Sequence, residues 1–125
     1  MKKVILNAVI LDLEGAVITA GTQRVAIDGN GQVIKDAQGQ PIREQKPMTF
    51  GKIALDALVR ATTKDDAEAK DKFALANQIN DNLKLVAPAE LQLEDADYDF
   101  VAGIIARQPL IVKARFIEMV EAQNA

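Results

Sequence analysis

The chain has 125 residues, of which 49% are hydrophobic, and this is the usual size of one domain that buries a core without metals or disulfides. Its net charge of -3 provides no basic surface for nucleic acid, so binding of DNA or RNA through bulk electrostatics is not expected. Cysteine is absent, which excludes a disulfide framework and a thiolate metal site. We therefore expect one domain with no nucleic-acid partner.

The missing residue types also restrict catalysis. The chain contains no His, no Cys and no Ser, and the common nucleophile and base arrangements of acyl transfer need at least one of these. The proton shuttle that His supplies near neutral pH would have to come from another residue, and no local pattern indicates one. Only oxygen ligands are left for a metal, which restricts the choice to Mg2+ or Ca2+. We predict that the protein is not an enzyme, has no catalytic residue and needs no cofactor.

The sequence begins MKKVILNAVILDLEG, in which two lysines precede an apolar run, as they do in a signal peptide. Asn7 interrupts that run, Asp12 and Glu14 close it, and no small-residue cleavage site follows. This segment is therefore expected to form a strand. No stretch approaches the roughly 18 consecutive apolar residues of a membrane span. We expect a cytoplasmic protein without a membrane partner.

The first part of the chain, over about residues 3–46, has the composition of short antiparallel strands. β-Branched and apolar segments alternate with turn signals there. The strongest turn signal is Asp28-Gly29-Asn30-Gly31, since Asp, Asn and Gly tolerate positive φ. A second turn follows over residues 36–41. These signals predict two or three antiparallel hairpins.

A calcium-binding loop beginning at Asp28 is the main alternative to the first turn. It fails at two discriminating positions, because Val33 stands where Gly is required and Gly39 stands where the bidentate Glu is required. A phosphate-binding loop would need a helix start after the turn, whereas β-like residues lie on both sides of this one. A hairpin turn is therefore the favoured interpretation.

From Thr49 onward the apolar residues follow the spacing of helices. Thr49 is placed to cap a first helix. The segment Thr62-Thr63-Lys64-Asp65 ends that helix and caps a second, which is predicted over residues 66–81. A third should begin at Glu94 or Asp95, and Pro109 favours the start of a fourth, which runs to about residue 122. The expected buried stripe of the second helix consists of Ala69, Phe73, Ala76 and Ile79.

Together these patterns predict an α+β fold. The antiparallel hairpins of about residues 3–46 should pack with about four C-terminal helices, in a single domain with a β-rich part at 1–46 and a helical part at 49–122. The order in which the strands pair does not follow from the sequence, because short β-segments can pair in several ways.

The most acidic stretch is LEDADYDF, which supplies the candidate metal ligands of this sequence. These candidates are Asp95, Asp97 and Asp99, with Glu94 or Asp28 as a further ligand. The glycine and the closing glutamate of a calcium loop are both missing at the required positions. Aspartates at i, i+2 and i+4 also do not share one helix face, since the middle one lies roughly opposite the others. We favour an acidic helix start over a metal site.

The apolar residues of the last predicted helix spread over about half of its circumference. A single core contact rarely needs so wide an arc. Either the helix is nearly enveloped by the domain, or the outlying residues Val112, Phe116 and Met119 face a partner chain. Burial is the favoured alternative, and these three residues are the candidate interface if it fails.

Several short segments follow one another in a suggestive order. They are LDLEG near the start, Gly39-Gln40-Pro41-Ile42, TFGKI opening a helix that ends ALDALV, LQLEDADYDFVAGII and PLIVKARFIEMVE. Their order resembles small phage and prophage proteins of unknown function, over most of the chain. The resemblance implies a viral origin and supplies no activity or catalytic residue. The stretch ITAGTQRVAIDGNGQVIKDA departs from it by enlarging the hairpin part.

Two classes of function follow from these observations. The first is a non-enzymatic interaction or structural module of a phage, which binds a protein partner or itself and acts in the host cytoplasm or in the virion. An inhibitor of a host enzyme or defence complex is the alternative within this class. The second and less favoured class is a carboxylate-based site, in either a protein that binds a divalent metal or a metal-dependent hydrolase.

Overall fold

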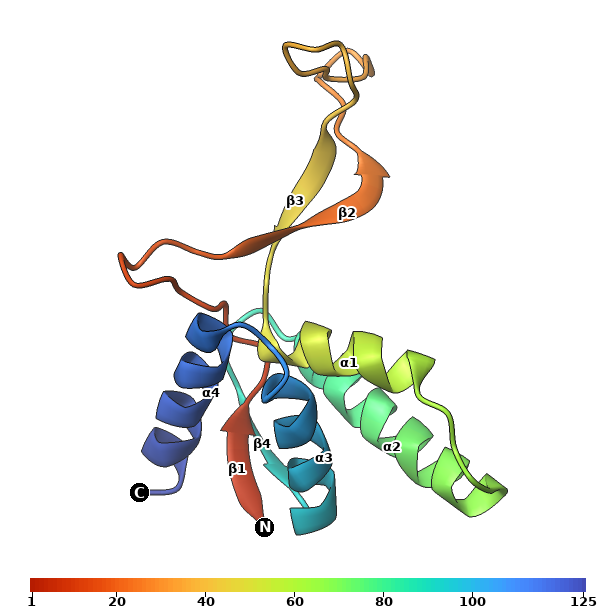
Figure 1. The fold of residues 1–125 in the computed structure, drawn as a ribbon, viewed down its shortest axis with the longest axis vertical. Coiled ribbons are helices and arrows are strands. Elements are labelled where there is room, and N and C mark those ends of the chain that lie inside the picture. The colour runs from red at the N-terminus through yellow and green to blue at the C-terminus, as the bar shows by residue number, and fades with distance from the viewer.

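The computed structural model describes the backbone of residues 1–125 and the side chains of all residues except 20–23. It confirms the predicted α+β class, with antiparallel strands toward the N-terminus and four helices in the C-terminal part of the described chain (Figure 1). The elements are β1 (Lys2–Ile5), β2 (Thr19–Val25), β3 (Arg43–Pro47), α1 (Phe50–Arg60), α2 (Asp66–Leu83), β4 (Glu90–Leu93), α3 (Asp95–Ile105) and α4 (Leu110–Gln123).

A helical body forms around a small sheet made of β1 and β4, which come from distant parts of the chain. The two strands are antiparallel, with Lys2 opposite Leu93 and Ile5 opposite Glu90. α4 packs against β1, and α1 packs against both α2 and α3. Both chain ends lie at the same end of this body (Figure 1).

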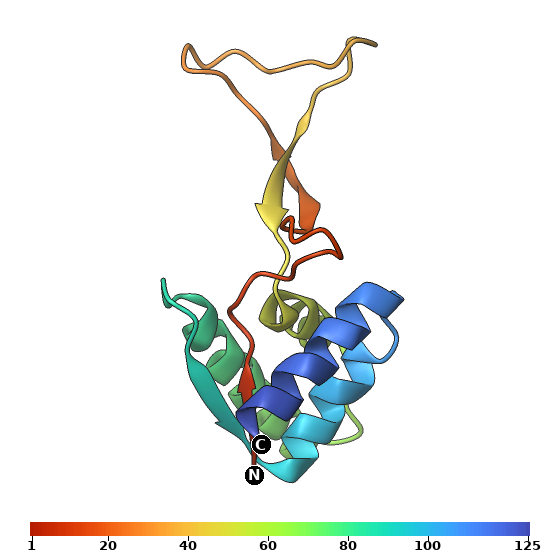
Figure 2. The ribbon, with the colours of Figure 1, turned by 90° about the vertical axis from the view of Figure 1, so that its left-hand side faces the viewer.

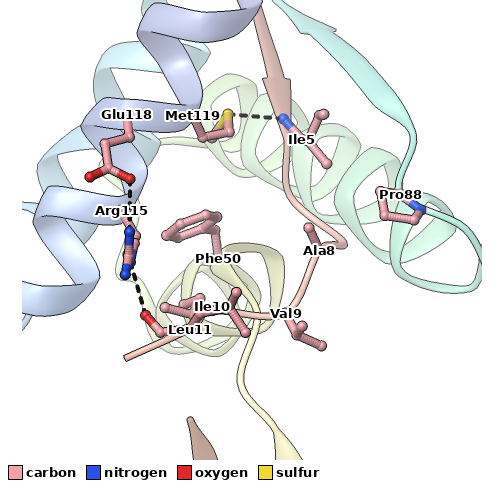
Figure 3. Close-up of a pocket in the computed structure, with 10 residues that line it drawn as sticks. All are labelled: Ile5, Ala8, Val9, Ile10, Leu11, Phe50, Pro88, Arg115, Glu118 and Met119. Atoms are coloured by element: carbon pink, nitrogen blue, oxygen red, sulfur yellow. Dashed lines mark hydrogen bonds and ion pairs between the residues drawn. The ribbon is translucent and has the colours of Figure 1, made fainter. Parts of the chain in front are cut away.

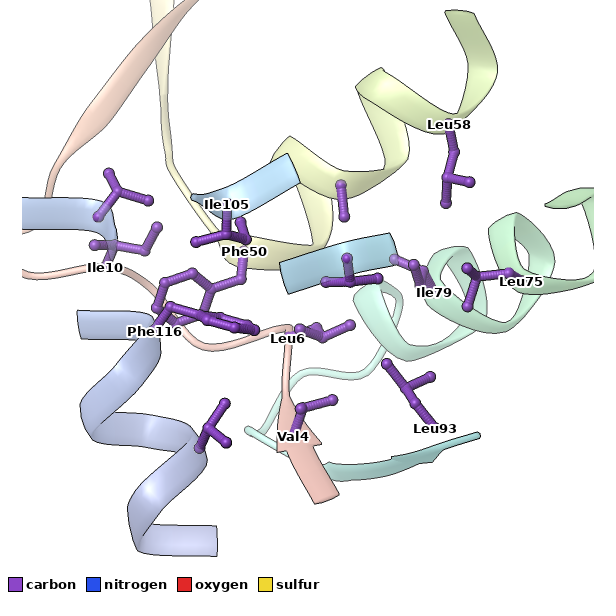
Figure 4. Packing of buried hydrophobic residues seen from close by; sticks show 14 residues of the cluster. Val4, Leu6, Ile10, Phe50, Leu58, Leu75, Ile79, Leu93, Ile105 and Phe116 are labelled. Atoms are coloured by element: carbon purple, nitrogen blue, oxygen red, sulfur yellow. The ribbon is translucent and has the colours of Figure 1, made fainter. Parts of the chain in front are cut away.

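The hydrophobic core lies between this sheet and the helices (Figure 4). Burial of each large apolar side chain stabilises the fold by about 1.5–3 kcal/mol, so the core holds the body together without covalent links. Most of its members lie in the four helices, while β1 contributes Val4 and β4 contributes Leu93. The buried residues include Val4, Leu6, Ile10, Phe50, Leu58, Leu75, Ile79, Leu93, Ile105 and Phe116.

The outer edge of β1 is closed by the last turns of α4. The side-chain amide of Asn124 accepts a hydrogen bond from the Lys3 N–H (3.0 Å) and donates one to the Lys3 carbonyl (2.9 Å). Further along, the Ile5 N–H donates to the Met119 sulfur at 3.2 Å. An unpaired strand edge is a template for association with other chains, and these side chains cover it in part.

The predicted caps explain where the first two helices begin. Thr49 accepts a hydrogen bond from the Lys52 N–H (3.1 Å) at the start of α1, and Asp65 accepts one from the Glu68 N–H (2.8 Å) at the start of α2. Such a bond satisfies one of the unpaired N–H groups of the first turn. Glu94 precedes α3 as expected, but its side chain forms no capping hydrogen bond.

The predicted buried stripe of α2 is wrong at two of its four positions, because Ala69 and Phe73 are both exposed. Phe73 is 69% exposed, whereas Leu75, Ile79 and Asn82 are buried. The helix carries apolar residues on two faces, and the face that holds Leu75 and Ile79 is the one that belongs to the buried core. Phe73 instead lines an open groove together with Val59, which is also 69% exposed.

Most of the predicted hairpin region projects away from the body. β2 and β3 pair as an antiparallel ribbon, with Thr19 opposite Pro47 and Val25 opposite Arg43. Residues 11–47, here called the arm, extend beyond the helices in both views of the ribbon (Figures 1 and 2). A two-stranded ribbon is only marginally stable by itself in water. The stability of the arm therefore depends on the contacts that the ribbon makes where it begins and where it ends.

Candidate interaction surface

The arm is joined to the body by a ring of three backbone hydrogen bonds, here called the inner junction. The Ile10 N–H donates to the Met48 carbonyl (2.9 Å), the Ile18 N–H to the Ile10 carbonyl (2.9 Å) and the Met48 N–H to the Ile18 carbonyl (2.8 Å). Three chain segments therefore meet at one point. The backbone N–H and the carbonyl of each junction residue are both hydrogen-bonded within the ring, as they would be in a sheet.

The same ring recurs at the far end of the arm, where we call it the outer junction. The Ala26 N–H donates to the Ile42 carbonyl (2.8 Å), the Ile34 N–H to the Ala26 carbonyl (3.0 Å) and the Ile42 N–H to the Ile34 carbonyl (2.9 Å). The order of donors and acceptors is identical in both rings. The β2–β3 ribbon is thus a stem between two equivalent three-way junctions.

The hairpins that leave these junctions end in loops of one kind. In each loop an Asp carboxylate accepts hydrogen bonds from the N–H groups two and four residues ahead, at 2.9–3.0 Å. A Gly with φ between 79° and 85° follows three residues after the Asp, which is a conformation that Gly adopts at little cost. The loops span residues 12–16, 28–32 and 36–40, and the second confirms the turn predicted at Asp28.

An eight-residue period in the sequence underlies this architecture, and it is the signal that turn-by-turn inspection missed. Val9, Val17, Val25 and Val33 recur at this interval, and Pro41 takes the next place. The residue after each is a junction residue, namely Ile10, Ile18, Ala26, Ile34 and Ile42. The second repeat has Ala20 and Gln23 where the others have Asp and Gly. No loop of this kind can form there, so the chain continues as β2.

The two junctions differ in what lies beneath their side chains. Ile10 is 1% exposed and belongs to the buried core, and Ile18 and Met48 pack against that core. At the outer junction, Ile34 is 39% exposed and Ile42 is 38% exposed. We call the side chains of Ala26, Ile34 and Ile42 the outer face. The outer face is apolar, as a core surface is. The chain's own core, however, covers only the equivalent side chains of the inner junction.

Residues next to the junctions lie on the opposite side of the arm, because successive side chains of an extended segment alternate. Ile27 and Val33 pair across the outer junction and are 60% and 45% exposed. Val9 and Val17 at the inner junction are exposed to a similar degree. Exposure on this side is therefore common to both junctions, and only the outer face distinguishes them.

Charges divide along the length of the arm. The stem carries three basic residues, Arg24, Arg43 and Lys46, against the single acidic Glu44. The two outer hairpins carry Asp28 and Asp36 against Lys35. The arm thus has a basic stem and an acidic far end.

Arg115 of α4 fixes the base of the arm to the body. Its guanidinium donates from Nε to the Leu11 carbonyl (3.0 Å) and from Nη2 to the Asp12 carbonyl (2.8 Å). It also forms an ion pair with Glu118 at 3.0 Å. These contacts lie at one side of an open, mainly apolar pocket of about 360 Å3, which Phe50 and Met119 also line (Figure 3).

The three candidate metal ligands of α3 do not converge. Asp95 forms an ion pair with the N-terminal amine of Met1 at 3.2 Å, Asp97 lines a shallow groove beside α2, and Asp99 is exposed. The Asp28 carboxylate binds backbone N–H groups of its own loop. Among the residues whose side chains are described, no group of three or more carboxylates, histidines or cysteines could hold a metal ion.

The three candidate interface residues of α4 face the chain's own body. Val112 is 3% exposed and Phe116 is 4% exposed, and the Phe116 ring contacts Phe50 edge-on with centroids 5.4 Å apart. Met119 is half-buried and accepts the hydrogen bond from β1. Burial within the domain therefore explains the wide apolar arc at these three positions. The large apolar residues that this helix leaves exposed are Leu110, at 82%, and Ile117, at 46%.

Comparison with protein-family models, with curated proteins and with solved structures found no match. Among the helices of the described chain, none is long and apolar enough to cross a membrane.

Proposed function

We propose that this protein is a non-enzymatic interaction or assembly module that contacts its protein partner through the outer face of the arm. The observation that carries this proposal is the pair of equivalent junctions. The core covers the apolar side chains of the inner junction, whereas Ile34 and Ile42 of the outer junction are more than one-third exposed. Exposed apolar patches that are larger than isolated side chains mark interaction sites.

The construction of the arm also supports a contact role. A chain that needed only stability would not place a two-stranded ribbon away from its core, because such a ribbon gains little from burial. A slender projection is instead suited to reach a surface that the body itself cannot approach. The phage or prophage origin implied by the resemblance is part of this proposal, and the genes that neighbour this one in its genome are its test.

An inhibitor of a host enzyme or defence complex is the second candidate. The narrow arm that projects from the body (Figures 1 and 2) favours it, since such a shape can enter a recess on another protein. Inhibition by protein contact needs no surplus of charge, which agrees with the small net charge of -3.

Photocrosslinking in the cell that encodes the protein tests the contact role. A photoreactive amino acid is placed at Ile34, on the outer face, and in a second variant at Val33, its neighbour on the opposite side. We expect a crosslinked protein at position 34 and little or none at position 33. Equal crosslinking at both positions, or none at position 34, would show that the outer face is not the contact surface.

A further inference from the structure

We propose that the partner of the outer face is a second copy of this chain, with two arms packed face to face in antiparallel orientation. This inference rests on the proposed function and names its partner. The two outer faces would meet near a two-fold axis. The outer hairpins of each copy would then lie along the stem of the other.

The inner junction shows what an apolar junction face packs against. Ile10 is buried in a cluster that contains Phe50 and Phe116 (Figure 4), so the matching surface is apolar and presents no unpaired polar group. The outer face of a second copy meets this requirement, since it is built from Ala26, Ile34 and Ile42. A two-fold contact uses the same patch on both chains and needs no other partner.

Charge selects the antiparallel orientation. The stem has three basic residues against one acidic residue, and the outer hairpins have two acidic residues against Lys35. Antiparallel arms place the acidic far end of one copy against the basic stem of the other, whereas parallel arms place like charges together. Complementary charges of this kind steer and orient association, and salt should weaken it because these residues are exposed.

The size of the outer face predicts a weak dimer. Stable interfaces bury about 1,200–2,000 Å2 in total, which three small or medium side chains per copy cannot supply alone. Antiparallel packing adds the length of the stem to the contact. We therefore expect a monomer–dimer equilibrium that depends on concentration.

Single-cysteine variants test the geometry directly, since the chain has no Cys of its own. Ile34→Cys places a thiol near the two-fold axis, and Val33→Cys places one on the opposite side of the same arm. Under mild oxidation of the purified chain, we expect a disulfide-linked dimer for Ile34→Cys and monomer for Val33→Cys. No dimer for Ile34→Cys, or as much for Val33→Cys, overturns the proposal.

Light scattering across a concentration series measures the dimer itself. Ile34→Asp should weaken it by more than about tenfold, because a buried contact residue becomes charged, and Ile27→Asp on the opposite side should change it little. A thermal melt of each variant confirms that the body is folded. A wild-type chain that stays monomeric, or a dimer that Ile34→Asp does not weaken, overturns the proposal.

Two exposed lysines distinguish the orientations. Lys46→Glu makes the stem less basic and should weaken the dimer by about two- to fivefold, whereas Lys35→Glu makes the far end more acidic and should strengthen it by a similar factor. Weakening by both variants overturns the antiparallel arrangement.

If the purified chain is monomeric while position 34 crosslinks another protein in the cell, this inference fails and the proposed function stands. If position 34 crosslinks nothing, both fail.

Discussion

Arg115 donates a hydrogen bond from its Nε to the backbone carbonyl of Leu11 across 3.0 Å, and so connects the last helix to the base of the arm. The backbone ring at Ile10 supplies the other connection. A carbonyl outside any sheet can be satisfied by water as well, so the guanidinium is not needed for folding of the loop. Its effect is to hold the arm in one direction relative to α4.

Replacement of Arg115 by Met should therefore loosen the arm more than it destabilises the body. Loss of charge-assisted hydrogen bonds costs about 1.5–3 kcal/mol each where they are buried and less at a half-exposed site. We expect faster amide exchange in residues 11–17, measured by hydrogen exchange, and a broader distance distribution in small-angle scattering. Lys113→Met, at an exposed position of the same helix, is the control. Unchanged exchange in both variants would show that the junction alone directs the arm.

Phe116 tests whether α4 is part of the core or an interface. Its side chain is 4% exposed and contacts Phe50, so Phe116→Ala should reduce the free energy of unfolding by about 3–5 kcal/mol. Ile117→Ala, next to it and 46% exposed, should cost about 0.5 kcal/mol or little more. Urea unfolding gives both values. A stable Phe116→Ala chain with altered self-association would instead restore the interface interpretation.

Two helical glycines offer a matched pair. A Cβ on Gly51 would lie 2.8 Å from Leu83 Cδ2 and 2.9 Å from the Leu6 carbonyl oxygen, whereas a Cβ on Gly103 would meet nothing within 4 Å. Gly51→Ala should therefore destabilise the chain by about 1–3 kcal/mol through overpacking. Gly103→Ala should stabilise it by up to about 1 kcal/mol, because Ala is the better helix former. Thermal or urea unfolding of both variants checks the opposite signs.

The parts of the fold that sequence patterns predict are those decided by neighbouring residues. The caps at Thr49 and Asp65, the acidic start of α3 and the turn at Asp28 each depend on a few side chains close in sequence. Pairing of β1 with β4 was not predicted, since it depends on contacts between distant segments, and several registers are compatible with such short strands. The position of Phe73 was missed for a related reason, because α2 has two apolar faces and tertiary packing decides which of them is buried.

The architecture of the candidate interaction surface can be predicted from the sequence, but not from helical or strand periodicity. Helical and strand periods of 3.6 and 2 residues do not detect a repeat of eight. Alignment of the segments that start at Val9, Val25 and Val33 brings Asp and Gly into register and predicts equivalent loops. The sequence does not show which junction is buried and which is exposed, because this difference depends on where the helices pack.

Tyr98 provides a readout of the α3–α4 contact through its ionisation. Its ring stacks on Phe116 with centroids 6.3 Å apart, and burial, together with the nearby Asp99 carboxylate, raises the pKa of the phenol above 10.0. The folded chain thus holds this proton more tightly than the unfolded chain does. The resulting contribution to stability is full below pH 10 and is lost as pH rises through the folded-state pKa.

We therefore expect the wild-type chain to lose stability relative to Tyr98→Phe as the pH is raised above about 10, with lysine and arginine titration common to both chains. Tyr98 is the only Tyr and Trp is absent, so phenolate absorbance reports this residue alone in a pH titration. Asp99→Asn should lower the pKa of Tyr98 only in part, because burial is the larger cause of the shift. A full return to the ordinary value in that variant would mean that Asp99, and not burial against Phe116, dominates.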